Sequence, residues 1–185
     1  MKKAKLFVSI ILLLGVITAC SKTYSIDDIK TQNGLTITRV EERTINMAFN
    51  KVDIPNDFKD IITFEKNEIL GFRTETSYIY LESITYDENK PEYYILNFNT
   101  SYYLDKGNYV TVPYYIEDQT YQFTAELKFH FVDDGFDLYD NALYMHGNGS
   151  DEKFAVAIKK DVYQKAHGII SFTMDKFYDL TYVAV

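Results

Sequence analysis

Apolar and polar residues alternate without a break over residues 121–131, and this pattern limits the fold more than any other in the chain. The apolar positions are Tyr121, Phe123, Ala125, Leu127, Phe129 and Phe131. A period of two is typical of a β-strand with one buried and one wet face. At about 3.3 Å per residue, the segment would form a strand of about 36 Å. We therefore expect an antiparallel sheet with one packed and one solvated face.

Shorter alternating segments follow one another along the rest of the chain. They cover residues 35–39, 45–49, 78–86, 94–98, 110–116, 170–174 and 180–185. Turns are predicted at residues 87–91, 105–108 and 133–135, which are rich in Asp, Asn, Gly and Pro. Residues 78–86 carry apolar side chains on both faces, with Ile84 on the face of Tyr78 and Tyr80, and predict a central strand. Pro113 cannot donate a backbone hydrogen bond, which places its strand at a sheet edge or a bulge.

Eight or nine short strands joined by hairpin-length turns predict an all-β domain. Our first choice is a single antiparallel β-sandwich of immunoglobulin-like type, although the chain lacks the Cys and Trp residues of antibody domains. A lipocalin-like β-barrel is the alternative. One short helix is expected where Asp161 and Gln164 have the spacing of a capping box and Gly168 provides a stop.

The N-terminus carries the features of a bacterial export signal. Lys2, Lys3 and Lys5 precede a 12-residue apolar run over residues 6–17, which ends close to Cys20, the only cysteine. As a helix this run would span about 18 Å, which is short of a hydrocarbon core of about 30 Å. The residues Ile17, Thr18, Ala19 and Cys20 match the lipobox, and here the chain resembles the bacterial lipoproteins.

The resemblance implies cleavage before Cys20 and a diacylglyceryl group on its thiol. Two acyl chains give stable anchoring where one chain gives only marginal binding. We therefore expect a signal peptide at residues 1–19, a lipidated tether at residues 20–34 and an all-β domain at residues 35–185. The expected location is the extracytoplasmic face of a bacterial cell membrane, with the membrane itself as a partner.

The charge balance limits the remaining partners. Residues 1–19 hold three of the 19 basic residues and none of the 27 acidic ones, so the processed chain has a net charge of −11. Nucleic acid and anionic lipid are poor partners for such a chain. A basic protein or another envelope component is a better candidate, and we expect no nucleic acid to bind.

Residues that could carry chemistry do not form a recognisable motif. His130, His146 and His167 fall in a predicted strand, a Gly-rich loop and a helix end, with no nucleophile at a suitable spacing. We therefore expect a protein that is not an enzyme and that has no cofactor. The densest acidic cluster is Asp133, Asp134, Asp137 and Asp140; we interpret it as a solvated turn, with a calcium loop as the alternative.

These observations lead to the hypothesis of a surface-anchored binding or interaction module for a protein or envelope component. The chain has 17 Tyr and 13 Phe but no Trp, and aromatic residues are frequent at interfaces when exposed. The candidate contacts are the tyrosines near two predicted hairpins, Tyr102, Tyr103, Tyr114 and Tyr115. The alternative function is a lipocalin-like carrier of a small apolar ligand.

Overall fold

The computed structural model describes residues 24–57, 60–66, 71–86, 88–116, 123–124, 128–133, 136–137, 142–145 and 153–185. Between residues 115 and 145 the description covers the backbone of the strands only.

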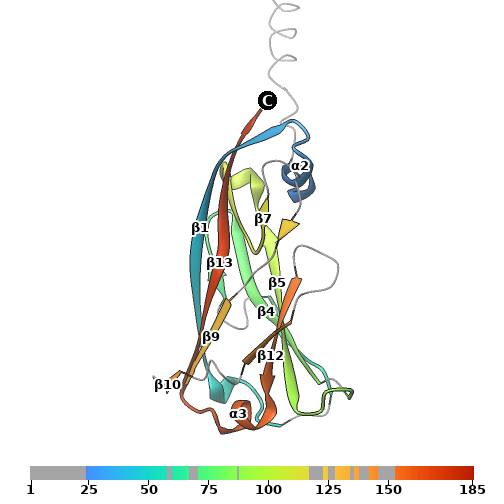
Figure 1. The fold of residues 1–185 in the computed structure, drawn as a ribbon, viewed down its shortest axis with the longest axis vertical. Helices are drawn as coiled ribbons and strands as arrows, with labels where there is room; N and C mark the ends of the chain where they lie inside the picture. Colours follow the sequence, from blue (N-terminus) through green and yellow to red (C-terminus); the bar gives the residue numbers. More distant parts are fainter. Residues whose placement is uncertain are drawn as a thin grey trace, which may run out of the picture.

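Two long strands, β1 (Leu35–Asn50) and β13 (Ile169–Ala184), lie side by side along most of the molecule (Figure 1). They pair antiparallel from Leu35 opposite Ala184 to Asn50 opposite Ile169. The sequence predicted two short strands in each of these segments, and this was wrong. Register shifts between Ile37 and Arg39 and between Arg43 and Ile45 interrupt the apolar alternation, while the backbone pairing continues past them.

The first sheet is completed on the other side of β13. Strand β9 (Lys128–Asp133) pairs with one end of β13, and β6 (Tyr109–Val112) pairs with the other end. Strand β10 (Phe136–Asp137) pairs antiparallel with β9, which confirms the predicted reversal at residues 133–135. Strand β6 ends at Val112 and β7 (Tyr115–Ile116) begins after Pro113. The proline therefore lies between two strands, whereas the sequence predicted one strand at a sheet edge or a bulge.

The predicted strand over residues 121–131 is divided in the structure. Strand β8 (Phe123–Thr124) pairs with β7, whereas β9 belongs to the first sheet. Residues 121–122 and 125–127 lie outside the described residues. Strands β8 and β9 therefore belong to different sheets, whereas the alternation predicted a single strand.

The second sheet has the strand order β11 (Ala142–Met145), β12 (Lys153–Lys159), β5 (Tyr93–Tyr102), β4 (Ser77–Tyr86) and β2 (Ile62–Thr63). Strand β3 (Phe72–Arg73) also pairs with β4. The prediction of a central strand at residues 78–86 is confirmed. Its facing was partly wrong, because a register shift between Leu81 and Ser83 turns Ile84 into the core beside Ile79.

The two sheets pack face to face around one large apolar cluster. Phe98 of β5 lies edge-on to Phe172 of β13 at 5.9 Å and stacks on Phe154 of β12 at 5.1 Å, so rings from both sheets interlock. The open sheets confirm an all-β sandwich. The alternative of a barrel is wrong, because the two sheets do not close into one.

Helix α2 (Ile26–Thr31) covers a second cluster at one end of the first sheet, and α3 (Lys160–Lys165) lies at the opposite end (Figure 1). Two short 3₁₀ helices, η1 (Lys51–Asp53) and η2 (Leu104–Lys106), follow β1 and β5. One helix was expected, and α3 confirms it. Its predicted capping box was wrong, because the N-cap is Lys159 and Asp161 lies inside the first turn.

The second helix, α2, lies within the predicted tether. Ile26 and Ile29 are buried against Val110 and Leu180 in the second cluster. Residues 26–31 are therefore packed against the first sheet, whereas the sequence placed them in the tether.

Candidate functional site

The tyrosines predicted to bind a partner lie in different environments. Tyr102 and Tyr103 are half-buried at the end of β5. Tyr114 is only 3% exposed and packs in the second cluster, so its predicted exposure was wrong. Tyr115 is in β7, and its side chain lies outside the described residues.

The other predicted site residues lie mostly outside the described residues. These are Cys20, Asp134 and Asp140, and for Asp133 and Asp137 only the strand backbone is described. Within the described ranges, no group of three or more His, Cys, Asp or Glu side chains could hold a metal ion. The calcium loop therefore stays a prediction.

An open cleft of about 620 Å³ lies where the N-terminus of α2 meets the end of β5. We call it the Lys66 cleft. Its walls are formed by residues 24–27, Lys66, residues 99–103 and the start of η2, namely Tyr24, Ser25, Ile26, Asp27, Lys66, Asn99, Thr100, Ser101, Tyr102, Tyr103, Leu104 and Asp105. Its volume is in the range of small-molecule sites. It brings the predicted Tyr102 and Tyr103 together with residues that sequence reasoning did not select.

The α2 wall of the cleft is set by a capping box. The Ser25 backbone N–H donates to Asp28 Oδ2 at 2.8 Å, and the Asp28 N–H donates to Ser25 Oγ at 3.2 Å. Ile26 and Ile29, three residues apart on the helix, then fix its inner face in the second cluster. This holds Tyr24 and Asp27 at the rim.

The opposite wall, at η2, is fixed by β13 and by the start of β4. The Tyr182 hydroxyl donates to the Gly107 carbonyl at 2.9 Å, and the Tyr103 N–H donates to the Thr76 carbonyl at 2.8 Å. Gly107 packs so closely that a Cβ there would lie 2.9 Å from Thr76 Cγ2. Only glycine allows this approach without a shift of Thr76.

The Lys66 side chain is held by aromatic rings and one hydroxyl. Its ammonium lies 5.2 Å from the ring centre of Tyr103 and 5.9 Å from those of Tyr78 and Tyr80. It donates to Ser101 Oγ at 3.0 Å. Each cation–π contact at an exposed site is worth about 0.5–1 kcal/mol. Among the described residues, no carboxylate forms an ion pair with Lys66.

Both acidic residues that line the Lys66 cleft already have cationic partners. Asp27 lies 3.5 Å from the Lys30 ammonium, and Asp105 lies 3.1 Å from that of Lys106. Among the described residues that line the cleft, Lys66 is therefore the charged residue without an ion-pair partner.

Asn99 is oriented by a polar ladder across the second sheet. Its amide donates to Glu82 Oε1 at 2.8 Å, and Lys153 donates to both Glu82 oxygens at 2.9 and 2.8 Å. Burial acts to raise the pKa of Glu82, but the hydrogen bonds from Lys153 and Asn99 outweigh it and hold this pKa below its usual value. The amide of Asn99 is therefore fixed at the edge of the cleft by an ionised partner.

A second open cleft of about 540 Å³ adjoins Tyr103 and is lined also by Arg73, Thr74, Glu75 and Lys106. The Arg73 guanidinium lies 4.2 Å from the ring centre of Tyr78. Tyr78, Tyr80 and Tyr103 form a tyrosine cluster beside Lys66. Tyr103 lines both clefts, and Arg73 contacts the Tyr78 ring of the same cluster.

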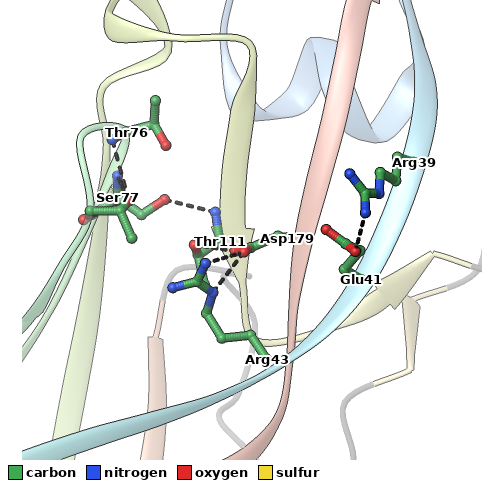
Figure 2. Close-up of polar contacts among 8 residues, drawn as sticks. Arg39, Glu41, Arg43, Thr76, Ser77, Thr111 and Asp179 are labelled. Carbon is green, nitrogen blue, oxygen red and sulfur yellow. Dashed lines mark hydrogen bonds and ion pairs between the residues drawn. The ribbon is translucent and has the colours of Figure 1, made fainter.

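A partly buried polar network joins the two sheets (Figure 2). Arg43 Nε of β1 donates to Asp179 Oδ2 of β13 at 2.6 Å, and Thr111 Oγ1 of β6 donates to Asp179 Oδ1 at 2.6 Å. The Thr111 N–H donates to Ser77 Oγ of β4 at 2.9 Å. The Ser77 hydroxyl accepts from a backbone amide and has no described base beside it, so we interpret the network as structural. Arg39 and Glu41 form a separate pair on the same strand as Arg43.

A second polar cluster lies at the α3 end. The Lys51 ammonium is 4.4 Å from the ring centre of Tyr163, whose hydroxyl donates to the Pro55 carbonyl at 3.0 Å. The Tyr94 hydroxyl donates to Asp57 Oδ1 at 2.8 Å. Burial raises the pKa of both phenols, so neither can act as a base at neutral pH. The cluster ties residues 51–57 to the sheet and to α3.

No protein-family model, curated protein or solved structure matches the chain. In the part of the chain that the structure describes, no helix is long and apolar enough to cross a membrane.

Proposed function

We propose that this protein is a lipid-anchored binding module on the extracytoplasmic face of a bacterial membrane, and that the Lys66 cleft is its binding surface. The observation that carries this proposal is the position of the cleft. One of its walls begins at Tyr24, four residues after the cysteine of the lipobox. A cleft lined by tyrosine rings, hydroxyls, an amide and one ammonium has the composition of a recognition site.

The short connection would hold this surface close to the lipid. A chain extends by at most about 3.6 Å per residue, so four residues reach about 14 Å at most. An acylated Cys20 would therefore keep Tyr24 within about 14 Å of the anchor. A ligand or partner in the cell envelope, close to the membrane, suits this placement. The net charge of −11 for the processed chain favours a partner with a basic surface for contacts outside the cleft.

The anchor is tested by labelling the protein with a fatty acid in bacteria. We expect the wild type to carry the label and Cys20→Ala to lose it. Label that persists in Cys20→Ala would contradict lipidation at this residue.

The binding surface is tested by placing a photo-crosslinking amino acid at position 103 in the anchored protein. The matched control is position 93, at the other end of β5 and also half-buried. We expect an adduct with an envelope component at position 103 and none at position 93. Equal adducts at both positions, or none at either, would contradict the cleft as the binding surface.

A further inference from the structure

The unbalanced charge of Lys66 gives the cleft a preference among possible ligands. Its ammonium is exposed, bonded to Ser101 and flanked by rings, and no described carboxylate forms an ion pair with it. An ammonium has three donors, and the bond to Ser101 uses one, so two can bind an incoming carboxylate or phosphate without breaking an existing ion pair. Asp27 and Asp105 repel such a group less than isolated carboxylates would, because each already has a lysine partner.

The other walls suit a molecule with many hydroxyl groups. Asn99 and Ser101 offer amide and hydroxyl groups that both donate and accept, next to the rings of Tyr24 and Tyr103. Such a mixture of flat apolar surface and neutral polar groups matches a sugar ring, which has apolar faces and a hydroxyl rim. The Glu82 ladder keeps the Asn99 amide in place for this contact.

The charge of the whole domain limits how acidic the ligand can be. With a net charge of −11, the processed chain repels polyanions over its surface. At physiological salt this repulsion fades over about 8 Å, so a single acidic group inside the cleft is affected mainly by the charges of the cleft itself, which are Lys66 and the lysine-paired Asp27 and Asp105.

We infer that the Lys66 cleft binds a saccharide that carries a single acidic group, with the acidic group at Lys66 and the sugar against Tyr103, Asn99 and Ser101. This inference rests on the proposed function and names the ligand class of the same cleft. A carboxylate and a phosphate share the chemistry that Lys66 recognises.

Calorimetric titration of the full chain in mild detergent tests the inference with matched sugars. The probes are sialyllactose against lactose for a carboxylate, and trehalose 6-phosphate against trehalose for a phosphate. We expect at least one acidic sugar to bind about 10-fold or more tightly than its neutral partner, the effect of one charge-assisted hydrogen bond. The pair with the larger ratio tells which acidic group the cleft takes.

Variants connect this preference to the cleft. Lys66→Met should remove the preference, while Lys165→Met should keep it, because Lys165 is also an exposed lysine but lies on α3. Tyr103→Leu should weaken acidic and neutral sugars alike, while Tyr93→Leu should not. A melting temperature within about 2 °C of the wild type shows that each variant is folded.

Five outcomes would overturn the inference. Equal binding of acidic and neutral sugars, or an unchanged preference in Lys66→Met, contradicts the role of Lys66. If no sugar binds while position 103 still forms its specific adduct, the ligand class is wrong and the proposed function stands. If an acidic peptide such as triglutamate binds in a Lys66-dependent way and the sugars do not, the cleft takes a peptide instead. Absence of both sugar binding and adduct removes the proposed function as well.

Discussion

Replacing Thr111 with valine tests whether the polar network of Figure 2 holds the two sheets together. The Thr111 hydroxyl is fully buried and donates to Asp179 at 2.6 Å. Valine has nearly the same shape and keeps the backbone N–H that donates to Ser77, so the change removes only the hydroxyl. Thr100→Val is the matched control. Thr100 is 2% exposed, and its hydroxyl has no hydrogen-bond partner among the described residues.

The two variants should change the free energy of unfolding in different ways. A hydrogen bond to a charged group contributes about 1.5–3 kcal/mol, and the added methyl group recovers part of this, so Thr111→Val should lose about 1–2 kcal/mol. Thr100→Val removes a buried hydroxyl that costs free energy to desolvate, so its free energy of unfolding should stay the same or rise by about 1 kcal/mol. For a domain of this size, each kcal/mol corresponds to about 2–4 °C in melting temperature.

Urea denaturation of the soluble domain at neutral pH, followed by far-UV circular dichroism, measures both free energies. Equal slopes with denaturant are needed for the comparison, because a changed slope indicates a changed unfolded state. A loss in Thr100→Val as large as that in Thr111→Val would refute the assignment of the two hydroxyls. An unchanged Thr111→Val would show that its bond to Asp179 does not stabilise the fold.

Three further predictions concern the ends of the domain and its pH limits. Ile29→Ala should cost about 2–4 kcal/mol in urea denaturation, because Ile29 of α2 is fully buried; a tether at this position would give no loss. The pKa of Glu82 is lowered in the folded state, so its contribution to stability is complete above pH 4.5 and is lost as the pH falls through the folded-state pKa. In urea denaturation at a series of pH values, Lys153→Met should move this loss of stability to higher pH, because it removes the ammonium that favours the ionised Glu82. Burial raises the pKa of Tyr163, so its contribution to stability is complete below pH 10.0 and is lost as the pH rises towards the folded-state pKa. Tyr163→Phe should delay alkaline unfolding, because the variant has no phenol here to ionise on unfolding; tyrosinate absorbance follows the transition.

The sequence predicted the strands whose side chains alternate between core and solvent. In β5, Tyr94, Leu96 and Phe98 alternate with half-buried residues, and the prediction there is confirmed. The length of β1 was missed because hydrophobic alternation reports burial and not pairing. Between Leu35 and Ile45 no side chain of β1 is fully buried: Arg39 is exposed and Arg43 is half-buried, while the backbone pairing with β13 continues.

Register shifts explain why one face assignment failed. From the sequence, Ile84 should share a face with Tyr78, because the two positions are an even number of residues apart. The irregularity between Leu81 and Ser83 changes the parity, so Ile84 joins Ile79 and Leu81 in the core. A bulge has no clear signal in a single sequence, and its effect on every later side chain is large.

The candidate site was only partly predictable because its walls come from distant parts of the chain. Tyr102 and Tyr103 were selected for their aromatic character beside a turn. Lys66 lies after a short irregular strand segment, and only the fold brings it to the tyrosine cluster. Helix α2 had one local signal, Ser25 three residues before Asp28, but its six residues are too few for a helical period.

The packing of α2 on the first sheet leaves few residues between the described domain and the lipidation site predicted at Cys20. A tether over residues 20–34 would let the domain rotate freely, so any face could meet any ligand. With α2 packed on the first sheet, only four residues separate Cys20 from Tyr24, a distance of about 14 Å at full extension. Figure 1 shows α2 and α3 at opposite ends of the molecule, so an acylated Cys20 would hold the α2 end, which forms one wall of the Lys66 cleft, closer to the membrane than α3. Ligands in the cleft would thus have to lie within the layer next to the membrane.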